Sequence, residues 1–218
     1  MIGRRGHFGL VLRVDEITAR QVSLVGSMFA HGSGVVDPSQ THFTLYKSDG
    51  MEDLQVFSDQ VLGVAHFLAG DIAKNGECVF SLGNLRVHGG KYLLWRASVS
   101  SAVTKAHDAA TNFLSSYVSR EQKQGMVDWA RAQSPSIRNR DLELVHQYAL
   151  QWVKWRNVPH LLCAFDPYEL SKAPPRSHRE HRGVFTRLEL VRFGKNGYIE
   201  EVCLSIPIVP TFVPSEKS

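Results

Sequence analysis

Two short β-prone segments each begin with a histidine, and each follows a segment with helical periodicity. The first is "THFTLYK" at 41–47 and the second is "PHLLCAF" at 159–165. Because side chains at positions i and i+2 of a strand point to the same face, His42 and Thr44 are predicted to stand side by side. His42 lies in the first half of the chain and His160 in the second. The pattern favours two similar lobes that each contribute one imidazole to a shared cleft.

The order of the predicted elements indicates an α+β fold. Strand-like runs are expected at 7–14, 41–47 and 158–167, with hairpins at 78–100 and 184–209 and helical segments at 15–30, within 50–71, at 101–123 and at 134–157. Several hairpins mixed with helices favour a sheet that carries its helices on the outer faces. Residues 1–218 are therefore predicted to form one domain of two lobes.

Composition narrows the class of protein. Hydrophobic residues make up 43% of the chain and charged residues 21%, as expected for a globular protein with a core. No apolar run approaches the roughly 20 residues of a membrane span, and no membrane partner is expected. Three cysteines without a C-x-x-C motif argue against a disulfide framework and a cysteine zinc site. We therefore expect a cytoplasmic protein. The net charge of +4 fits a phosphate-bearing partner but does not require one.

The histidine-led strands and the element order resemble the two-histidine (2H) phosphoesterase superfamily, which includes the RNA 2′,3′-cyclic phosphodiesterases. The signature of that superfamily is two copies of His-x-Thr/Ser-x, one on a strand of each lobe. The first copy is matched in full by "HFTL" at 42–45. Further matches cover nearly the whole chain: "HFGLVLRV", "CVFSLGNLRVHGGKYLLWRASVS" and "VFTRLELVRFGKNGYIEEVCLSIPI".

The resemblance implies a bilobal α+β fold, with two pseudo-symmetric lobes whose antiparallel sheets line a central cleft and whose helices lie outside. It also implies a phosphoric diester hydrolase that needs no cofactor and no metal, with nucleotide or RNA as substrate. The expected linkages are cyclic phosphates or 2′–5′ bonds. The two motifs lie farther apart than is usual in the superfamily, which suggests a helical insertion around 120–155. No oligomeric state is predicted.

The second motif departs from the signature, because it reads "HLLC" at 160–163. Leu162 stands where the superfamily has Thr or Ser. Strand alternation places Leu162 on the face of His160 and turns Cys163 away, so the thiol does not replace the missing hydroxyl. This departure keeps an alternative open: a non-catalytic nucleotide- or RNA-binding module with the same fold.

The resemblance assigns acid–base catalysis to His42 and His160 and phosphate binding to Thr44. An imidazole titrates near pH 6.5, so a neutral and a protonated histidine coexist near neutrality and supply both base and acid. A hydroxyl beside an imidazole would hold a non-bridging phosphate oxygen. The sequence leaves open which histidine is the acid and which is the base.

Five further residues are candidates for binding the substrate. Aromatic rings stack on nucleobases, which makes Tyr46, Trp95 and Tyr168 candidates for that contact. Arg176 lies in a basic loop and would contact phosphate. Leu162 would line the site beside His160.

Overall fold

The computed structural model describes residues 6–30, 32–51, 58–74, 77–88, 91–116, 118–133, 136–148, 159–165, 181–194 and 197–210. Its strands are β1 (Gly6–Val14), β2 (His42–Met51), β3 (Val79–His88), β4 (Tyr92–Ser98), β5 (His160–Phe165), β6 (His181–Phe193) and β7 (Ile199–Pro207). Its helices are α1 (Glu16–Ser27), α2 (Ser58–Ala73), α3 (Ser101–Ser115), α4 (Arg120–Gln133) and α5 (Asn139–Tyr148). The mixed α+β architecture predicted from the sequence is confirmed.

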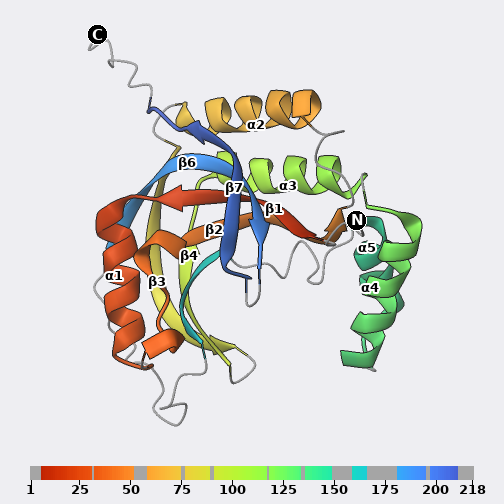
Figure 1. Cartoon of the computed structure of the whole chain (residues 1–218), viewed down its shortest axis with the longest axis horizontal. Coiled ribbons are helices and arrows are strands. Elements are labelled where there is room, and N and C mark those ends of the chain that lie inside the picture. The colour runs from red at the N-terminus through yellow and green to blue at the C-terminus, as the bar shows by residue number, and fades with distance from the viewer. Residues whose placement is uncertain are drawn as a thin grey trace.

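All strand pairs are antiparallel, and strand β6 joins two halves of one sheet. The order is β2-β1-β6-β3-β4-β5, with β7 also paired to β6. The first residues of β6 pair with β3, and the remainder lies between β1 and β7. Figure 1 shows β6 running along the molecule from one half to the other. The two histidine strands, β2 and β5, therefore lie at opposite ends of the strand order.

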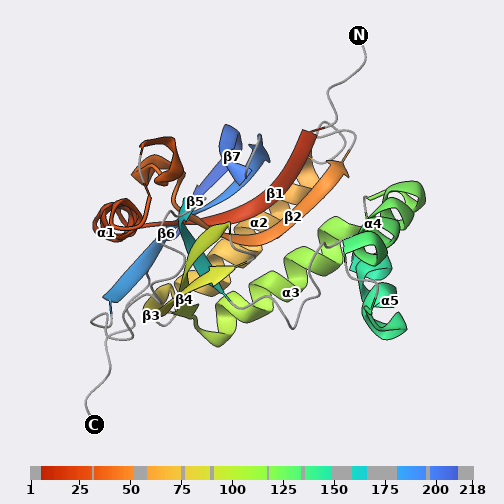
Figure 2. The ribbon, with the colours of Figure 1, turned by 90° about the horizontal axis from the view of Figure 1, so that it is seen from below.

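The two strands that begin with a histidine, β2 and β5, each pack against a helix. In both cases this helix leads, along the chain, to the other of the two strands. Helix α1 leads into β2 but packs against β5, whereas α3 follows β4 and packs against β2. Helix α2 lies over β6 and β7. Figure 2 shows α1 on one side of the strands and α2 with α3 on another. This crossed packing ties the two halves together and leaves the helices outside the sheet.

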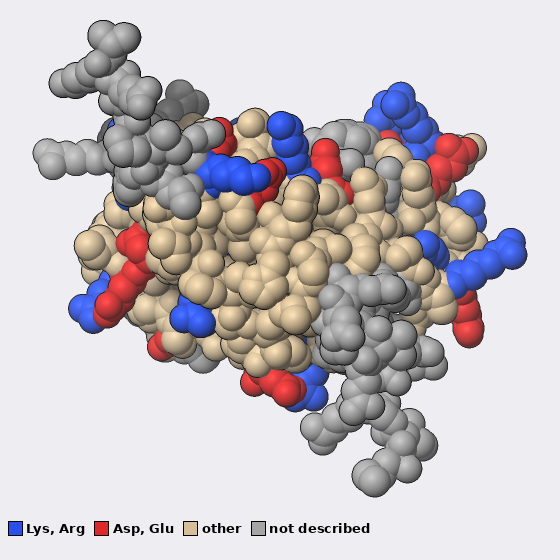
Figure 3. Space-filling model, turned by 90° about the horizontal axis from the view of Figure 1, so that it is seen from above, with Lys and Arg blue, Asp and Glu red and all other residues tan. Residues whose placement is uncertain are grey.

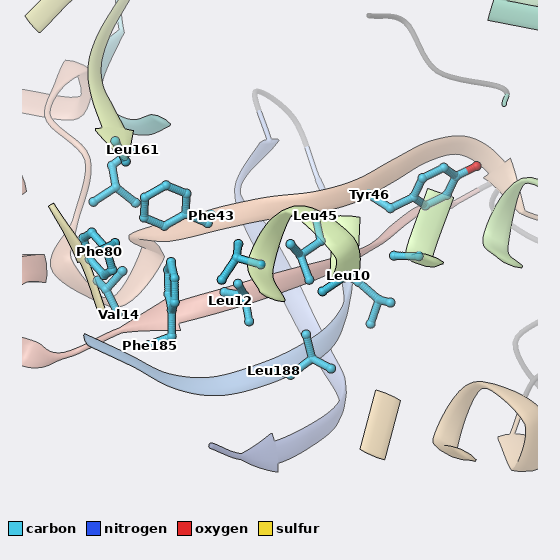
Figure 4. Packing of buried hydrophobic residues seen from close by; sticks show 14 of the residues in the cluster. Leu10, Leu12, Val14, Phe43, Leu45, Tyr46, Phe80, Leu161, Phe185 and Leu188 are labelled. Carbon is cyan, nitrogen blue, oxygen red and sulfur yellow. The ribbon is translucent and has the colours of Figure 1, made fainter. Parts of the chain in front are cut away.

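The shared core brings the beginnings of β2 and β5 together. Phe43 of β2 packs edge-to-face on Phe80 and Phe185, with ring centroids 5.1 and 5.0 Å apart. Figure 4 shows Leu161 of β5 beside Phe43 in the same cluster of buried residues. Because His42 precedes Phe43 and His160 precedes Leu161, this packing fixes the two histidines at neighbouring positions in the fold.

Local capping explains where the helices begin. Asp15 caps α1, as its Oδ1 accepts a hydrogen bond of 2.8 Å from the backbone N–H of Thr18. The single helix predicted over 101–123 is wrong, because α3 ends at Ser115 and α4 begins at Arg120. A capping box restarts the helix: Ser119 Oγ accepts from the Gln122 N–H, and Gln122 Oε1 accepts from the Ser119 N–H.

The range predicted as a helical insertion, 120–155, contains α4 and α5. These two helices pack against each other, and α5 also contacts α3. Their helical character agrees with the prediction. That this range is an insertion stays a prediction.

The face over α2 carries few charges at its centre. Figure 3 shows uncharged side chains across the middle of this face and charged side chains toward its edges. Leu62 and Phe67 of α2 are exposed. The net positive charge of the chain therefore does not gather on this face. None of the described helices has the length and apolarity that a membrane span requires.

Candidate active site

His42 is the first residue of β2, and a main-chain contact holds its ring. Its Nδ1 lies 2.6 Å from the carbonyl oxygen of Gln40, so Nδ1 carries the proton and donates it to that oxygen. This leaves Nε2 as the unprotonated nitrogen of the neutral ring. The ring also packs against Phe193, with centroids 5.6 Å apart.

The segment before β2 is fixed at both ends of the short 3₁₀ turn Pro38–Gln40. Asp37 caps this turn through a 2.8 Å hydrogen bond from the Ser39 N–H. The amide side chain of Gln40 reaches the start of β7, where its Oε1 accepts from the Ile199 N–H at 2.7 Å. The carbonyl that orients His42 is therefore held by contacts to a strand from the far end of the chain.

The pKa of His42 is lowered from its ordinary 6.5 to about 4. Removal of the ring from water is the largest cause, and the hydrogen bond to the Gln40 carbonyl opposes it. The charges of Arg13, Lys47 and His160 lower the pKa further. His42 is therefore neutral at pH 7, in the form that accepts a proton.

His160 opens β5 as His42 opens β2, and it is half-buried. The charge of His160 lowers the pKa of His42, so the two imidazoles lie within electrostatic reach of each other. His160 and Thr44 line one cavity of about 340 Å³, whose other walls come from β2, α3, Val99 and the residue before β5. His107 and Asp108 of α3 are polar groups in that wall.

Side chains of the two histidine strands lie on the faces that strand alternation predicts. Thr44 is exposed, and Leu162 is half-buried on the face of His160. Cys163 is wholly buried on the opposite face, where burial raises the pKa of its thiol. The second strand therefore has no hydroxyl beside its histidine.

Two predicted base-stacking residues, Tyr46 and Trp95, lie in the core. Tyr46 is 1% exposed, because a bulge between β1 and β2 makes Leu45 an extra residue and turns Tyr46 away from the face of Thr44. Trp95 is 2% exposed and donates its indole N–H to the Gly83 carbonyl at 2.8 Å. This burial contradicts the stacking role predicted for both rings. Tyr168 and Arg176 lie outside the described residues, so their roles stay predictions.

Sequence reasoning missed a charged network on the face that carries His42. Glu189 of β6 is 5% exposed, and its Oε2 lies 3.1 Å from Nε of Arg13 on β1. Its Oε1 accepts a 2.9 Å hydrogen bond from Ser205, whose hydroxyl oxygen accepts another from Arg187. The signal was a charged residue inside an otherwise apolar strand, as in "LVLRV" and "LELV".

The described residues contain no group of three or more His, Cys, Asp or Glu side chains placed to hold a metal ion.

Comparison with solved structures identifies the fold. TT0787 of Thermus thermophilus superposes with a TM-score of 0.54 at 14% identity, over 93% of this chain and 97% of that one. E. coli LigT complexed with phosphate gives 0.51 at 11% identity, over 94% and 98%. LigT complexed with NADP+ gives 0.52 at 12% identity, over 94% and 99%.

Neither family models nor curated protein sequences give a match to this chain. The likeness therefore lies in the three-dimensional arrangement, which spans nearly all of both chains. TT0787 and LigT have the 2H phosphoesterase fold. This chain has the 2H phosphoesterase fold.

Proposed function

We propose that this protein is a metal-independent phosphodiesterase that hydrolyses cyclic-phosphate or 2′–5′ linkages in RNA, nucleotides or oligonucleotides. The observation that carries the proposal is the state of His42, which is neutral, with Nδ1–H donated to a carbonyl and Nε2 able to accept a proton. A second imidazole, that of His160, lies within electrostatic reach. Two imidazoles supply both proton transfers that diester hydrolysis requires.

In the proposed reaction, Nε2 of His42 removes a proton from the attacking water. The lone pair of the water oxygen forms the new P–O bond, and the bond from phosphorus to the ribose oxygen breaks. Protonated His160 donates its proton to that leaving oxygen, which gives a phosphomonoester and a free hydroxyl. The hydroxyl of Thr44 would bind a non-bridging oxygen. This scheme assigns the base to His42 and the acid to His160.

Ligands in the solved structures are compatible with such a substrate. E. coli LigT has been crystallised with phosphate, with 3′-AMP and with NADP+. These complexes are those of LigT, and a nucleotide substrate for the present protein is part of the proposal. A cytoplasmic location also stays a prediction.

The test is turnover of a nucleotide panel in the presence of EDTA. The panel contains 2′,3′-cyclic nucleotides, 3′,5′-cyclic nucleotides and 2′–5′ linked dinucleotides. We expect hydrolysis that falls by about 10²–10⁴-fold in His42→Ala and His160→Ala and is retained in His66→Ala, since His66 is exposed on α2. Turnover that survives both site substitutions would overturn the site, and nucleotide binding without turnover would favour the non-catalytic module.

A further inference from the structure

An arginine stands opposite each histidine in the sheet. Arg13 of β1 is the cross-strand partner of His42, and Arg96 of β4 is the partner of His160. Directly opposed residues of antiparallel strands project from the same face, with Cβ atoms about 4.5–5.5 Å apart. Each imidazole therefore has a guanidinium beside it on the face where the proposed reaction occurs.

Arg13 is held in place by its contact with buried Glu189. The 3.1 Å ion pair joins Nε of Arg13 to Oε2 of Glu189. Nη1 is buried and has no hydrogen-bond acceptor among the described residues. The side chain is 21% exposed. Glu189 thus orients a guanidinium whose buried Nη1 keeps a donor for an anion that reaches it.

Arg13 also acts on His42 through space, since its charge is one cause of the lowered pKa of the imidazole. The two groups are therefore near each other in the fold as well as opposed in the ladder. Arg96 is half-buried, and no ion pair to it is found within the described part of the chain. Its guanidinium remains a net cation on the face of His160 and Leu162.

The charge on this surface matches what the reaction develops. Arg13 and Arg187 share the single carboxylate of Glu189, which leaves one positive charge of these three groups unbalanced, and Lys47 adds a further cation near His42. Arg96 contributes another on the His160 side. A phosphodiester carries one negative charge. When water attacks and loses its proton, the negative charge on the phosphoryl oxygens increases. Preorganised cations are stabilising where such charge develops.

We propose that Arg13 and Arg96 bind the non-bridging oxygens of the substrate phosphate, one from the strand paired with each histidine strand, and take over the contact that a hydroxyl at position 162 would make. This inference rests on the proposed function, because it names the phosphate contacts of the same site. Glu189 is a positioning residue, which acts through Arg13.

The experiment measures two properties of each variant: the affinity for adenosine 3′-monophosphate and for inorganic phosphate by calorimetry, and kcat/KM for a 2′,3′-cyclic nucleotide. Arg13→Gln and Arg96→Gln are expected to weaken binding of both anions by about 10- to 100-fold each, the usual loss of a charge-assisted hydrogen bond. The lysine variants, which keep the charge, are expected to recover part of that loss. Arg20→Gln removes the same charge from the exposed surface of α1 and serves as the matched control.

A structural effect is separated from a binding effect by a second substitution. Arg13→Gln leaves Glu189 without its ion pair, so Arg13→Gln combined with Glu189→Gln removes both charges together. We expect the combined variant to regain thermal stability but not phosphate affinity. Recovery of affinity with stability would show that Arg13 only supports the fold, which overturns the inference.

The two proposals fail in different ways. Turnover by the wild type that is unchanged in both glutamine variants would overturn the arginine contacts and leave the phosphodiesterase standing. Phosphate binding that depends on the two arginines, without turnover of any substrate, would overturn the phosphodiesterase and leave the arginine contacts standing. Equal anion affinity in the wild type and in both variants would remove the arginine inference whatever the turnover.

Discussion

The two histidine strands begin alike and differ two residues later. Strand β2 continues with exposed Thr44 beside His42, whereas β5 continues with half-buried Leu162 beside His160. In each strand the intervening residue, Phe43 or Leu161, packs into the common core. The two strands are thus alike in the buried residue that follows each histidine. They differ at the next residue, on the face where the reaction is proposed.

The surroundings of His42 are suited to a base. The Gln40 carbonyl fixes its tautomer, and Arg13 and Lys47 favour the uncharged ring. If the two halves also divide the reaction, then the half with the hydroxyl holds the base and the half with the leucine holds the acid. Substitutions in each half test whether the base and the acid are divided in this way.

The largest expected effect is removal of either imidazole. His42→Ala and His160→Ala should each lower kcat/KM by about 10²–10⁴-fold, because each removes one of the two proton transfers. Since the two groups act in one step, the double variant should be little slower than the worse single variant. Steady-state kinetics on a 2′,3′-cyclic nucleotide measures this. Losses that multiply in the double variant would indicate that the histidines act independently.

The next largest effect is expected from the residue two positions after each histidine, which has a hydroxyl at Thr44 and none at Leu162. Thr44→Val should lower kcat by about 10²–10³-fold, because it removes a preorganised donor. Leu162→Val should change little, and Leu162→Thr should raise kcat by about 2- to 10-fold, as a new hydrogen bond of ordinary strength would. A large loss in Leu162→Val would show that leucine itself has a role in the site.

The pH dependence should report the lowered pKa of His42. A base must be neutral, so kcat/KM should fall as the pH drops through about 4 and not through 6.5. Burial, Arg13, Lys47 and His160 hold the pKa down, and the Gln40 carbonyl opposes them. Arg13→Gln should therefore move this acidic limb to higher pH. An acidic limb near 6.5 in the wild type would contradict the environment described for His42.

The same pKa affects stability. The unfolded chain binds a proton at His42 below pH 6.5, whereas the folded protein does so only near pH 4. The contribution of this group is therefore complete above pH 6.5 and is lost as the pH falls toward 4. Denaturant unfolding between pH 7 and 4 should show a shallower decline in His42→Phe than in the wild type.

The smallest effect contrasts two neighbours on β4 that face opposite ways. Trp95→Phe should lower the free energy of unfolding by about 1 kcal/mol, because the Gly83 carbonyl loses its indole partner. It should leave phosphate affinity unchanged, unlike Arg96→Gln. Loss of nucleotide affinity with unchanged stability would restore the stacking role predicted for Trp95.

The sequence predicted much of the fold, because its local signals agree with the tertiary structure. Alternation placed Leu162 and Cys163 on the correct faces of β5. The order of helices and strands was sufficient to predict the architecture.

The failures in the surroundings of His42 came from features that depend on strand pairing. Counting by twos from His42 assigns Tyr46 to the wrong face, because a bulge adds one residue at Leu45. Arg13 and Glu189 carry no motif, and only the register of β1 with β2 and β6 brings them beside His42. Cross-strand neighbours become visible once the register is known.

The measurement that tests the central claim most directly is a leaving-group comparison. Each histidine variant is assayed on a 2′,3′-cyclic nucleotide and on a uridine 3′-(4-nitrophenyl phosphate), whose nitrophenolate leaves without needing a proton. If His160 is the acid, His160→Ala should regain most of its lost rate on the nitrophenyl ester while His42→Ala stays slow. Equal losses for both variants on both substrates would contradict the assignment of base and acid to the two strands.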